Sequence, residues 1–378
     1  MPRTHRETSP SRPPGIASRT ALTPLSSRSF SLLLSVLLAV PLTTAACTGG
    51  SVTGSGATTT AASTGGPSAA PTTAPSPTTA AATASTSTGA PTLLPSPVLA
   101  VKIDNTSPAR PRIGIGSADI VYIEPVEGGL TRLLAVFSSR MPAQVGPVRS
   151  ARESDGALLG NYGRVAFAYS GGSAYTLARV AKGPQIDVSY DTSAVGYRRE
   201  PRRAAPYNVI GDPAALLARA AGAQPAGDLG WRLGPAPAGG APASRLEAAY
   251  PAARVAFTWD PTRGRYLVAT DGSPEVDGGT DAGTGGQQVG AATVLVLTVP
   301  VSLSANVDVN GARTPLVGVV GSGPVRVLRE GQAYSGTWTR PSAAAPTTLT
   351  TAAGAGLTLA GGPVWVLLVA AGTAVTIG

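Results

Sequence analysis

The chain has 378 residues, of which 43% are hydrophobic and 13% charged, and its formal net charge is +9. Arg outnumbers Lys by 27 to 2, and Gly and Pro are abundant, a bias typical of a GC-rich genome, so we predict an actinobacterial source. Because genome composition accounts for the excess of arginine, the basic charge does not indicate a nucleic-acid partner, and none is expected.

Residues 1–46 have the parts of a bacterial secretory signal peptide in order. Five arginines precede an apolar run from Phe30 to Leu42, which is too short to span a bilayer, and small residues then lead to Cys47, the only cysteine. A lone thiol cannot form an internal disulfide, so its place after the apolar run indicates lipid attachment. The last four residues, Thr44-Ala45-Ala46-Cys47, resemble a bacterial lipobox, with threonine where leucine is usual.

Lipidation at Cys47 predicts an extracytoplasmic protein on the outer face of the plasma membrane, held by two acyl chains. The alternative is an ordinary signal peptide that is cleaved near Ala46. Cleavage removes five arginines, Glu7 and His5, the only histidine, so the formal charge falls from +9 to +5. A mature chain without histidine or a free thiol excludes Ser-His-Asp and Cys-His catalysis, and it excludes zinc sites built on His or Cys.

Residues 47–97 consist almost entirely of Thr, Ala, Ser, Gly and Pro, without a charged or aromatic residue. Such a segment cannot bury enough apolar surface to offset the loss of chain entropy, so we predict a disordered stalk. A flexible chain of this length would reach roughly 40 Å from its anchor.

Order is expected to begin near Val98, and strands and helices then alternate up to residue 225. The predicted strands are Val98–Ile103, Ala118–Tyr122, Thr131–Ser138 and Val165–Tyr169, and the predicted helices are Ala174–Ala181 and Pro213–Ala221, the latter after an Asp212 cap. The run Leu133–Phe137 is apolar throughout, as in a strand that is buried on both faces. The alternation predicts an α/β layered domain over residues 98–225.

Residues 226–245 form a predicted linker rich in Pro, Gly and Ala, and the pattern changes after it. Short β-type runs follow at Val255–Trp259, Arg265–Thr270, Thr293–Val299, Val325–Arg329, Leu357–Leu359 and Val364–Val369. We therefore predict a smaller, mostly-β domain over residues 246–378. The expected fold class is α+β, with an α/β layered domain followed by this β domain.

Charged and polar residues gather between Asp104 and Asn208, mostly at the ends of apolar strands, where α/β sheets build their sites. Candidate anion-binding residues are Arg132, Arg149, Ser150 and Arg152, and candidate acidic or metal-binding residues are Asp104, Asp119, Glu124 and Glu127. The other residues of these motifs are Asn105, Arg110, Gly128, Gly129, Gly171, Gly172 and Asn208. Any metal here would be a hard cation held by oxygen atoms.

These segments resemble the YerB-type lipoprotein family, a bacterial family of unknown function. The resemblance covers residues 98–208, including the Gly-Pro-Val-Arg-Ser-Ala-Arg segment at 146–152, and resumes at Asp277 and over residues 331–365. It departs at Arg112, Ile123 and Tyr207, where the family has Gln, an acidic residue and His. The resemblance implies a two-part fold and the location of a site, but it implies no activity.

A second resemblance concerns the order of an apolar strand, the segment 147–152, another apolar strand, Gly-Gly and a helix, which is similar to that in LytR-CpsA-Psr proteins. Those enzymes attach glycopolymers to peptidoglycan from polyprenyl-pyrophosphate carriers. The resemblance places Arg149 and Arg152 on a pyrophosphate, with magnesium on acidic residues, and a planar guanidinium that is always charged suits this task. Ser150 stands where that family has an aspartate.

Several of these motifs also have a purely structural interpretation. Gly128-Gly129 would be a turn, and Asp119 would cap the strand that follows it. Trp338 and Trp365 would belong to the β core rather than to a sugar-binding platform.

The same alternative holds for Arg149 and Arg152, which would pair with carboxylates instead of a ligand. The available partners are Glu124, Glu127 and Asp155. If the segment ran into a helix, residues three apart would lie on one face and both guanidinium groups could meet one anion.

The stalk and the lack of His and Cys favour a binding or scaffold module of the cell envelope over an enzyme. Its expected partners are the membrane, through the lipid anchor, and a cell-wall glycan, a polyprenyl phosphate or an envelope protein. No cofactor is expected on this interpretation. The alternative is a protein that binds polyprenyl phosphate or pyrophosphate, with magnesium as a cofactor and phosphotransferase activity like that of LytR-CpsA-Psr proteins.

Overall fold

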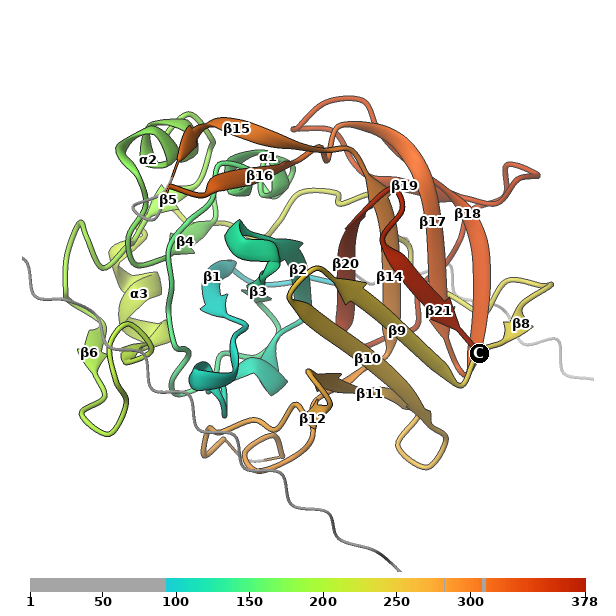
Figure 1. Cartoon of the computed structure of the whole chain (residues 1–378), viewed down its shortest axis with the longest axis horizontal. Coiled ribbons are helices and arrows are strands. Elements are labelled where there is room, and N and C mark those ends of the chain that lie inside the picture. The colour runs from blue at the N-terminus through green and yellow to red at the C-terminus, as the bar shows by residue number, and fades with distance from the viewer. Residues whose placement is uncertain (1–92, 282, 308–310) are drawn as a thin grey trace, which may run out of the picture. The chain divides into compact units, whose positions relative to one another are not determined.

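The computed structural model describes residues 93–281, 283–307 and 311–378, which are coloured in Figure 1. The predicted signal peptide, the predicted lipidation site Cys47 and most of the predicted stalk lie outside this part of the chain. No helix in the described part is long and apolar enough to cross a membrane.

The described chain up to residue 225 contains short helices and strands. The α-helices are α1 (Asp155–Leu158), α2 (Ala174–Val180) and α3 (Pro213–Arg219). The strands are β1 (Leu99–Asp104), β2 (Ile120–Pro125), β3 (Thr131–Phe137), β4 (Ala166–Ala168), β5 (Ile186–Asp187), β6 (Tyr197–Arg199) and β7 (Val209–Gly211).

After residue 225 the regular elements of the described chain are all strands. They are β8 (Ala241–Pro242), β9 (Arg245–Tyr250), β10 (Ala253–Asp260), β11 (Arg265–Thr270), β12 (Ser273–Pro274), β13 (Gly290–Ala291), β14 (Thr293–Val299), β15 (Val301–Val307), β16 (Arg313–Val317), β17 (Gly321–Arg329), β18 (Gln332–Arg340), β19 (Thr348–Thr350), β20 (Val364–Ala370) and β21 (Ala374–Ile377). The prediction of a mostly-β second half is therefore confirmed.

Strands from both halves of the sequence form one central sheet. Its order is β19-β18-β17-β14-β20-β2-β3-β1-β4-β5, with β8 beside β18. The two halves join where β2 runs parallel to β20 and Ile120 lies opposite Val364. The sheet is therefore continuous across the predicted linker.

Both faces of the middle strands are covered, which explains why the run Leu133–Phe137 of β3 is apolar throughout. On one face, Leu133 and Ala135 belong to a core shared with the second sheet, whose strand order is β12-β11-β10-β9-β21. Figure 1 shows β9 and β10 in front of the lower ends of β2 and β20, with β11 below β10. On the other face, Leu134 and Val136 share a core with Leu158 of α1. All seven residues of β3 are buried, as predicted for a strand buried on both sides.

The prediction of an α/β layered first domain is confirmed only in part. The neighbours β1, β3 and β2 are antiparallel, and parallel pairing within this half is found between β1, β4 and β5. The link between β2 and β3, residues 126–130, is too short for the crossover that parallel strands need. The helices are four to seven residues long and cannot form a complete layer.

Local features agree better with the sequence patterns. The Asp212 carboxylate accepts hydrogen bonds from two backbone N–H groups at the start of α3, as predicted for a cap. Trp338 and Trp365 are buried in the core.

The predicted strand Leu357–Leu359 is wrong, because this segment is irregular chain with single bridges. Packing begins before residue 98, since Leu94 is buried.

Candidate functional site

A row of charged side chains crosses β1, β3 and β2 at one end of the central sheet. Asp104 lies opposite Arg132, and Arg132 lies opposite Glu124, so the three residues form one cross-strand row. Because side chains alternate along a strand, Lys102 projects from the same face of β1 as Asp104. These four residues are 0–5% exposed, which is rare for so many charges at one place.

Two further arginines reach this row from the irregular segment that precedes α1. Arg149 Nε donates to Asp104 Oδ2 at 2.7 Å, and Arg152 donates to Glu127 Oε2 through Nε at 2.9 Å and Nη2 at 2.6 Å. The sequence offered Glu124, Glu127 and Asp155 as partners of the two arginines. Glu127 is indeed the partner of Arg152, whereas Arg149 pairs with Asp104, which was not among them. The helix that would have placed the two arginines on one face begins only at Asp155.

Arg132 lies deepest among the three arginines and has the fewest partners. It is 5% exposed, and its Nε and Nη1 atoms have no hydrogen-bond partner among the described residues. The nearest carboxylate is that of Asp104, at 3.8 Å from Nη2. Burial lowers the pKa of Arg132 to about 10, and the positive charges of Arg152 and Arg149 add to this effect while Asp104 opposes it.

We call Asp104, Glu127, Arg132, Arg149 and Arg152 the outer group. Its two carboxylates are stabilised in their charged form. Burial raises the pKa of Asp104, but the charge of Arg132 and hydrogen bonds from Thr106 and Arg149 outweigh burial, so the net pKa lies below its usual value. The pKa of Glu127 is lowered in the same way, with Arg152 as the main opposing charge. Both carboxylates are therefore ionised at neutral pH.

A second, inner group is centred on Lys102. Its Nζ forms ion pairs with Glu124 and with Asp155, the latter at 3.0 Å from Oδ1. Asp155 is the first residue of α1, and its Oδ2 accepts the backbone N–H of Arg152 at 2.6 Å. The inner group is thus fixed to the segment that carries the outer arginines.

Three of the four predicted acidic metal ligands are engaged by cations rather than left free. Asp104 pairs with Arg149, Glu127 with Arg152 and Glu124 with Lys102. Over the part of the chain that the structure describes, no group of three His, Cys, Asp or Glu side chains is arranged to hold a metal ion.

Residues from the second half of the sequence cover the cluster. Thr314 of β16 donates to Glu127, and Ser304 of β15 donates to Glu153 at 2.6 Å. In Figure 1, β16 passes across α1 and β15 runs above it. On the other side, the ring of Tyr207 lies 5.6 Å from the guanidinium carbon of Arg149.

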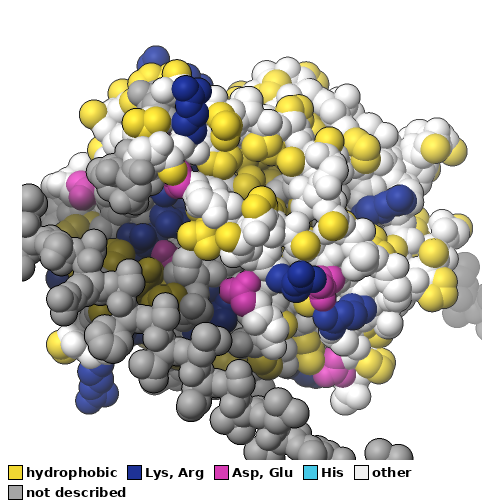
Figure 2. All heavy atoms as spheres, in the orientation of Figure 1, with side chains coloured by type: hydrophobic (Ala, Val, Ile, Leu, Met, Phe, Trp, Pro, Cys, Tyr) yellow, Lys and Arg dark blue, Asp and Glu magenta, His cyan; other side chains and the backbone are white. Residues whose placement is uncertain are grey.

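The outer arginines are only partly covered, with side-chain exposures of 20% for Arg149 and 14% for Arg152. Figure 2 shows Lys and Arg side chains with carboxylates among them inside a recess left of centre, where β1 lies in Figure 1. The outer group can therefore be reached from solvent, whereas the inner group cannot.

Several predicted site residues lie beside the cluster, where they form a turn or link two strands. Gly128 and Gly129 form a turn with positive φ angles of 68° and 73°, and a Cβ atom on Gly129 would lie 2.6 Å from Pro251. Asn105 donates to Thr131 at 2.7 Å and so ties β1 to β3.

The loop before α2 also borders the outer arginines. Gly171 donates its N–H to Asp191, and a Cβ atom on Gly171 would lie 3.1 Å from Ser150 Oγ. Gly172 follows in the same loop, ahead of the Ser173 cap of α2.

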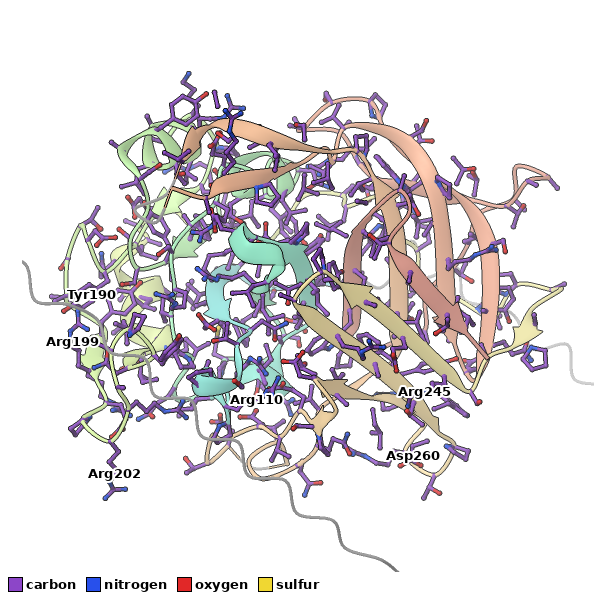
Figure 3. All side chains as sticks on the ribbon, in the orientation of Figure 1. Arg110, Tyr190, Arg199, Arg202, Arg245 and Asp260 are labelled. Atoms are coloured by element: carbon purple, nitrogen blue, oxygen red, sulfur yellow. The ribbon has the colours of Figure 1, made fainter. Side chains whose placement is uncertain are left out.

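Other predicted residues are not brought to the cluster. Asp119 lies at the opposite end of β2, where it accepts the N–H groups of Ser138 and Ser139. Asn208 accepts from Arg199 on the β6–β7 hairpin. Arg110 pairs with exposed Asp271 in the turn between β11 and β12, and Figure 3 labels Arg110 below the centre of the view.

The inner residues Lys102 and Asp155 were not among the predicted site residues. One signal was available, because Lys102 is the only charged residue in the predicted strand Val98–Ile103. A single charge within an apolar strand indicates either an edge position or a buried partner. The sequence offers no sign of which distant carboxylate supplies that partner.

Two family models match the chain. The N-terminal domain model of "Protein of unknown function (DUF3048)" matches residues 83–226, and the C-terminal domain model matches residues 246–366. "Putative lipoprotein YerB" of Bacillus subtilis (strain 168) is 60% identical over 45 residues, which are 12% of this chain and only 14% of that protein. The crystal structure of Bacillus subtilis YerB has a similar fold, with a TM-score of 0.61 and 20% identity over 75% of this chain and 95% of that one.

Proposed function

Because the chain belongs to the DUF3048 family, whose function is unknown, we propose a role from its own side chains: a lipid-anchored envelope protein whose folded part binds a phosphate-type anion at Arg132, Arg149 and Arg152. The observation that carries the anion site is Arg132, a buried guanidinium whose Nε and Nη1 atoms have no hydrogen-bond partner in the described part of the chain. Arg112 and Arg340 each have one buried nitrogen without a partner among the described residues, whereas Arg132 has two. Because native proteins leave few buried polar groups unpaired, this double deficit points to a ligand.

The charges of the outer group support an anion rather than a cation. The outer group has three arginines but only two carboxylates, Asp104 and Glu127, and Arg132 shares Asp104 with Arg149. The second carboxylate of the inner group, Glu124, balances the total charge of the cluster, but it is paired with Lys102. A guanidinium binds phosphate oxygens through two parallel N–H groups, and such bonds are stronger away from water. A phosphate or pyrophosphate would satisfy Arg132 and balance the outer group.

Binding is proposed in preference to phosphoryl transfer. Each carboxylate of the cluster that could hold magnesium or activate a nucleophile against a bound phosphate is paired with a cation. The resemblance to LytR-CpsA-Psr proteins suggests that the anion belongs to a polyprenyl phosphate or pyrophosphate of the envelope.

We expect the full chain to bind pyrophosphate and the Arg132→Met variant to bind it roughly 10–100-fold more weakly, because a charged hydrogen-bonded contact contributes about 1.5–3 kcal/mol. Isothermal titration calorimetry with pyrophosphate and with inorganic phosphate, each with and without Mg²⁺, measures this. Arg199→Met is the control, since Arg199 lies on the exposed β6 strand and should leave the affinity unchanged. Equal affinity of the wild type and Arg132→Met, or no heat from either anion, would contradict the proposal.

The lipid anchor rests on the sequence Thr44-Ala45-Ala46-Cys47 and on similarity to a relative named a lipoprotein. We expect Cys47→Ser to release the protein into the medium or to leave an unprocessed precursor, because the thioether to the lipid cannot form. Cell fractionation and mass measurement distinguish these forms from wild type. A Cys47→Ser protein that is processed and remains in the membrane fraction would show that another feature anchors the chain.

A further inference from the structure

The inner group places one amine between two carboxyl groups in a site closed to water. The exposed fractions are 0% for Lys102, 1% for Glu124 and 0% for Asp155. On the same face of the sheet, the neighbour of Lys102 on β3 is Leu134, and Ala100 lies one row deeper on β1. Lys102 is therefore the innermost charge of the cluster, at its boundary with the apolar core.

We infer that Lys102 and Asp155 form an intramolecular amide bond, with Glu124 as the proton carrier. The bond would join β1 to the first turn of α1 across 53 residues of sequence. It would also close a loop that contains Arg132, Arg149 and Arg152. The inference does not depend on whether those arginines bind an anion.

The reaction is a condensation that needs no further reactant. The neutral Nζ amine attacks the Asp155 carboxyl carbon, a C–N bond forms, and the C–OH bond breaks. One proton leaves the nitrogen and joins the departing hydroxyl group, so that one water molecule is released. Glu124, in direct contact with Nζ, is placed to take the proton from the amine and to deliver it to the hydroxyl group.

The environment favours the neutral amine that this reaction requires. Burial lowers the pKa of Lys102 to about 8, an effect that Asp155 opposes and that Arg132 and Arg152 reinforce, so roughly a tenth of the amine is neutral at pH 7. Two carboxyl groups face this one amine. Transfer of one proton from the Lys102 ammonium group to a facing carboxylate would produce the neutral amine and a carboxylic acid together, so the reaction needs no outside acid or base.

Asp155 rather than Glu124 is assigned as the bonded partner because its carboxyl group is held for attack. Its Oδ1 lies 3.0 Å from Nζ, and its Oδ2 accepts the Arg152 N–H at 2.6 Å. That N–H would stabilise negative charge as it develops on the oxygen during attack. Fixing both reactants in contact replaces a bimolecular encounter by a step within one molecule, which accelerates it greatly.

Peptide mapping of the full chain, purified from membranes and digested after denaturation, tests the bond. Trypsin cuts after Lys and Arg except before Pro, so an unlinked chain yields Ile103–Arg112 and Glu153–Arg164. In the linked chain both peptides should disappear, because trypsin cannot cut after an acylated Lys102. Further digestion with chymotrypsin, which cuts after Leu99, should release one branched peptide lighter than its two parts by one water.

The same digest identifies the partner. The peptide Ile113–Arg132, which carries Glu124, should stay free. If it disappears while Glu153–Arg164 remains, the assignment of Asp155 is overturned. If Ile103–Arg112 and Glu153–Arg164 are both recovered in full yield, no amide is formed and the inference is wrong.

Two variants test the role of Glu124. Glu124→Gln keeps the size of the side chain but cannot carry the proton, so the linked fraction should fall at least tenfold. Glu200→Gln is the matched control, because Glu200 forms an exposed pair with Arg198 outside the cluster, and its linked fraction should equal that of wild type. An unchanged linked fraction in Glu124→Gln would remove Glu124 from the reaction.

Discussion

Replacing Arg112 with methionine is expected to lower the free energy of unfolding by roughly 3–5 kcal/mol, the cost of leaving a buried charge without its partner. Arg112 has no exposed surface and forms an ion pair with Glu275, which is 2% exposed. Its Nε also donates to the backbone oxygen of Asp104 at 2.7 Å. Methionine fills similar space, so the lost charge rather than a cavity dominates the effect.

Arg110→Met provides the control for this prediction. Arg110 lies two residues earlier and also pairs across the two halves of the chain, with Asp271 at 2.7 Å. Its side chain is 18% exposed and that of Asp271 is 39% exposed, so water screens the pair and its loss should cost less than about 1 kcal/mol. Urea denaturation of both variants measures the difference. Equal losses would show that burial does not set the strength of these pairs.

The replacement of Asp277 with alanine is expected to destabilise the protein by roughly 2–5 kcal/mol, because three backbone donors lose their acceptor and an unsatisfied buried donor costs about 1–3 kcal/mol. One of the three hydrogen bonds is buried, and the other two are partly buried. The Asp277 carboxylate is fully buried and accepts the backbone N–H groups of Gly114, Gly116 and Gly279, each at 2.8 Å. It thereby holds a loop of the first half against a loop of the second. Asp277 is also one of the residues on which the family resemblance rests.

The control for Asp277 is an aspartate that accepts backbone N–H groups at the surface. Asp260, labelled in Figure 3, accepts from Thr262 at 2.9 Å and from Arg263 at 3.2 Å in an exposed turn. Water can replace these bonds, so Asp260→Ala should cost about 1 kcal/mol. Thermal and urea unfolding of both variants give the comparison. A loss for Asp277→Ala no greater than for Asp260→Ala would mean that the three N–H groups find other partners.

Local order follows from the sequence wherever one segment suffices to define it. The strands β11 and β14 have the predicted bounds Arg265–Thr270 and Thr293–Val299, because an apolar or alternating run between turn residues favours a strand whatever its neighbours are. The Asp212 cap depends on residues within one helical turn. The family resemblance, now confirmed by both domain models, also rests on contiguous motifs.

The sequence was sufficient to locate the candidate site, but it did not identify which charged residues pair with one another. The motifs place Asp104, Arg132, Arg149 and Arg152 in one region, and the structure brings them together. Their partners were predicted less well, because an ion pair depends on which strand ends meet. Asp119 belongs to the same motifs as Glu124, yet the length of β2 separates the two carboxylates.

The tertiary structure alone decided how the two halves combine and which charges are buried. The parallel pairing of β2 with β20 joins segments more than 200 residues apart, and no local pattern encodes that choice. The depth of Lys102 likewise depends on covering segments that are distant in sequence. Hydrophobic periodicity reports which face of a strand avoids water, whereas the burial of a charge and the identity of its partner depend on every element that packs against it.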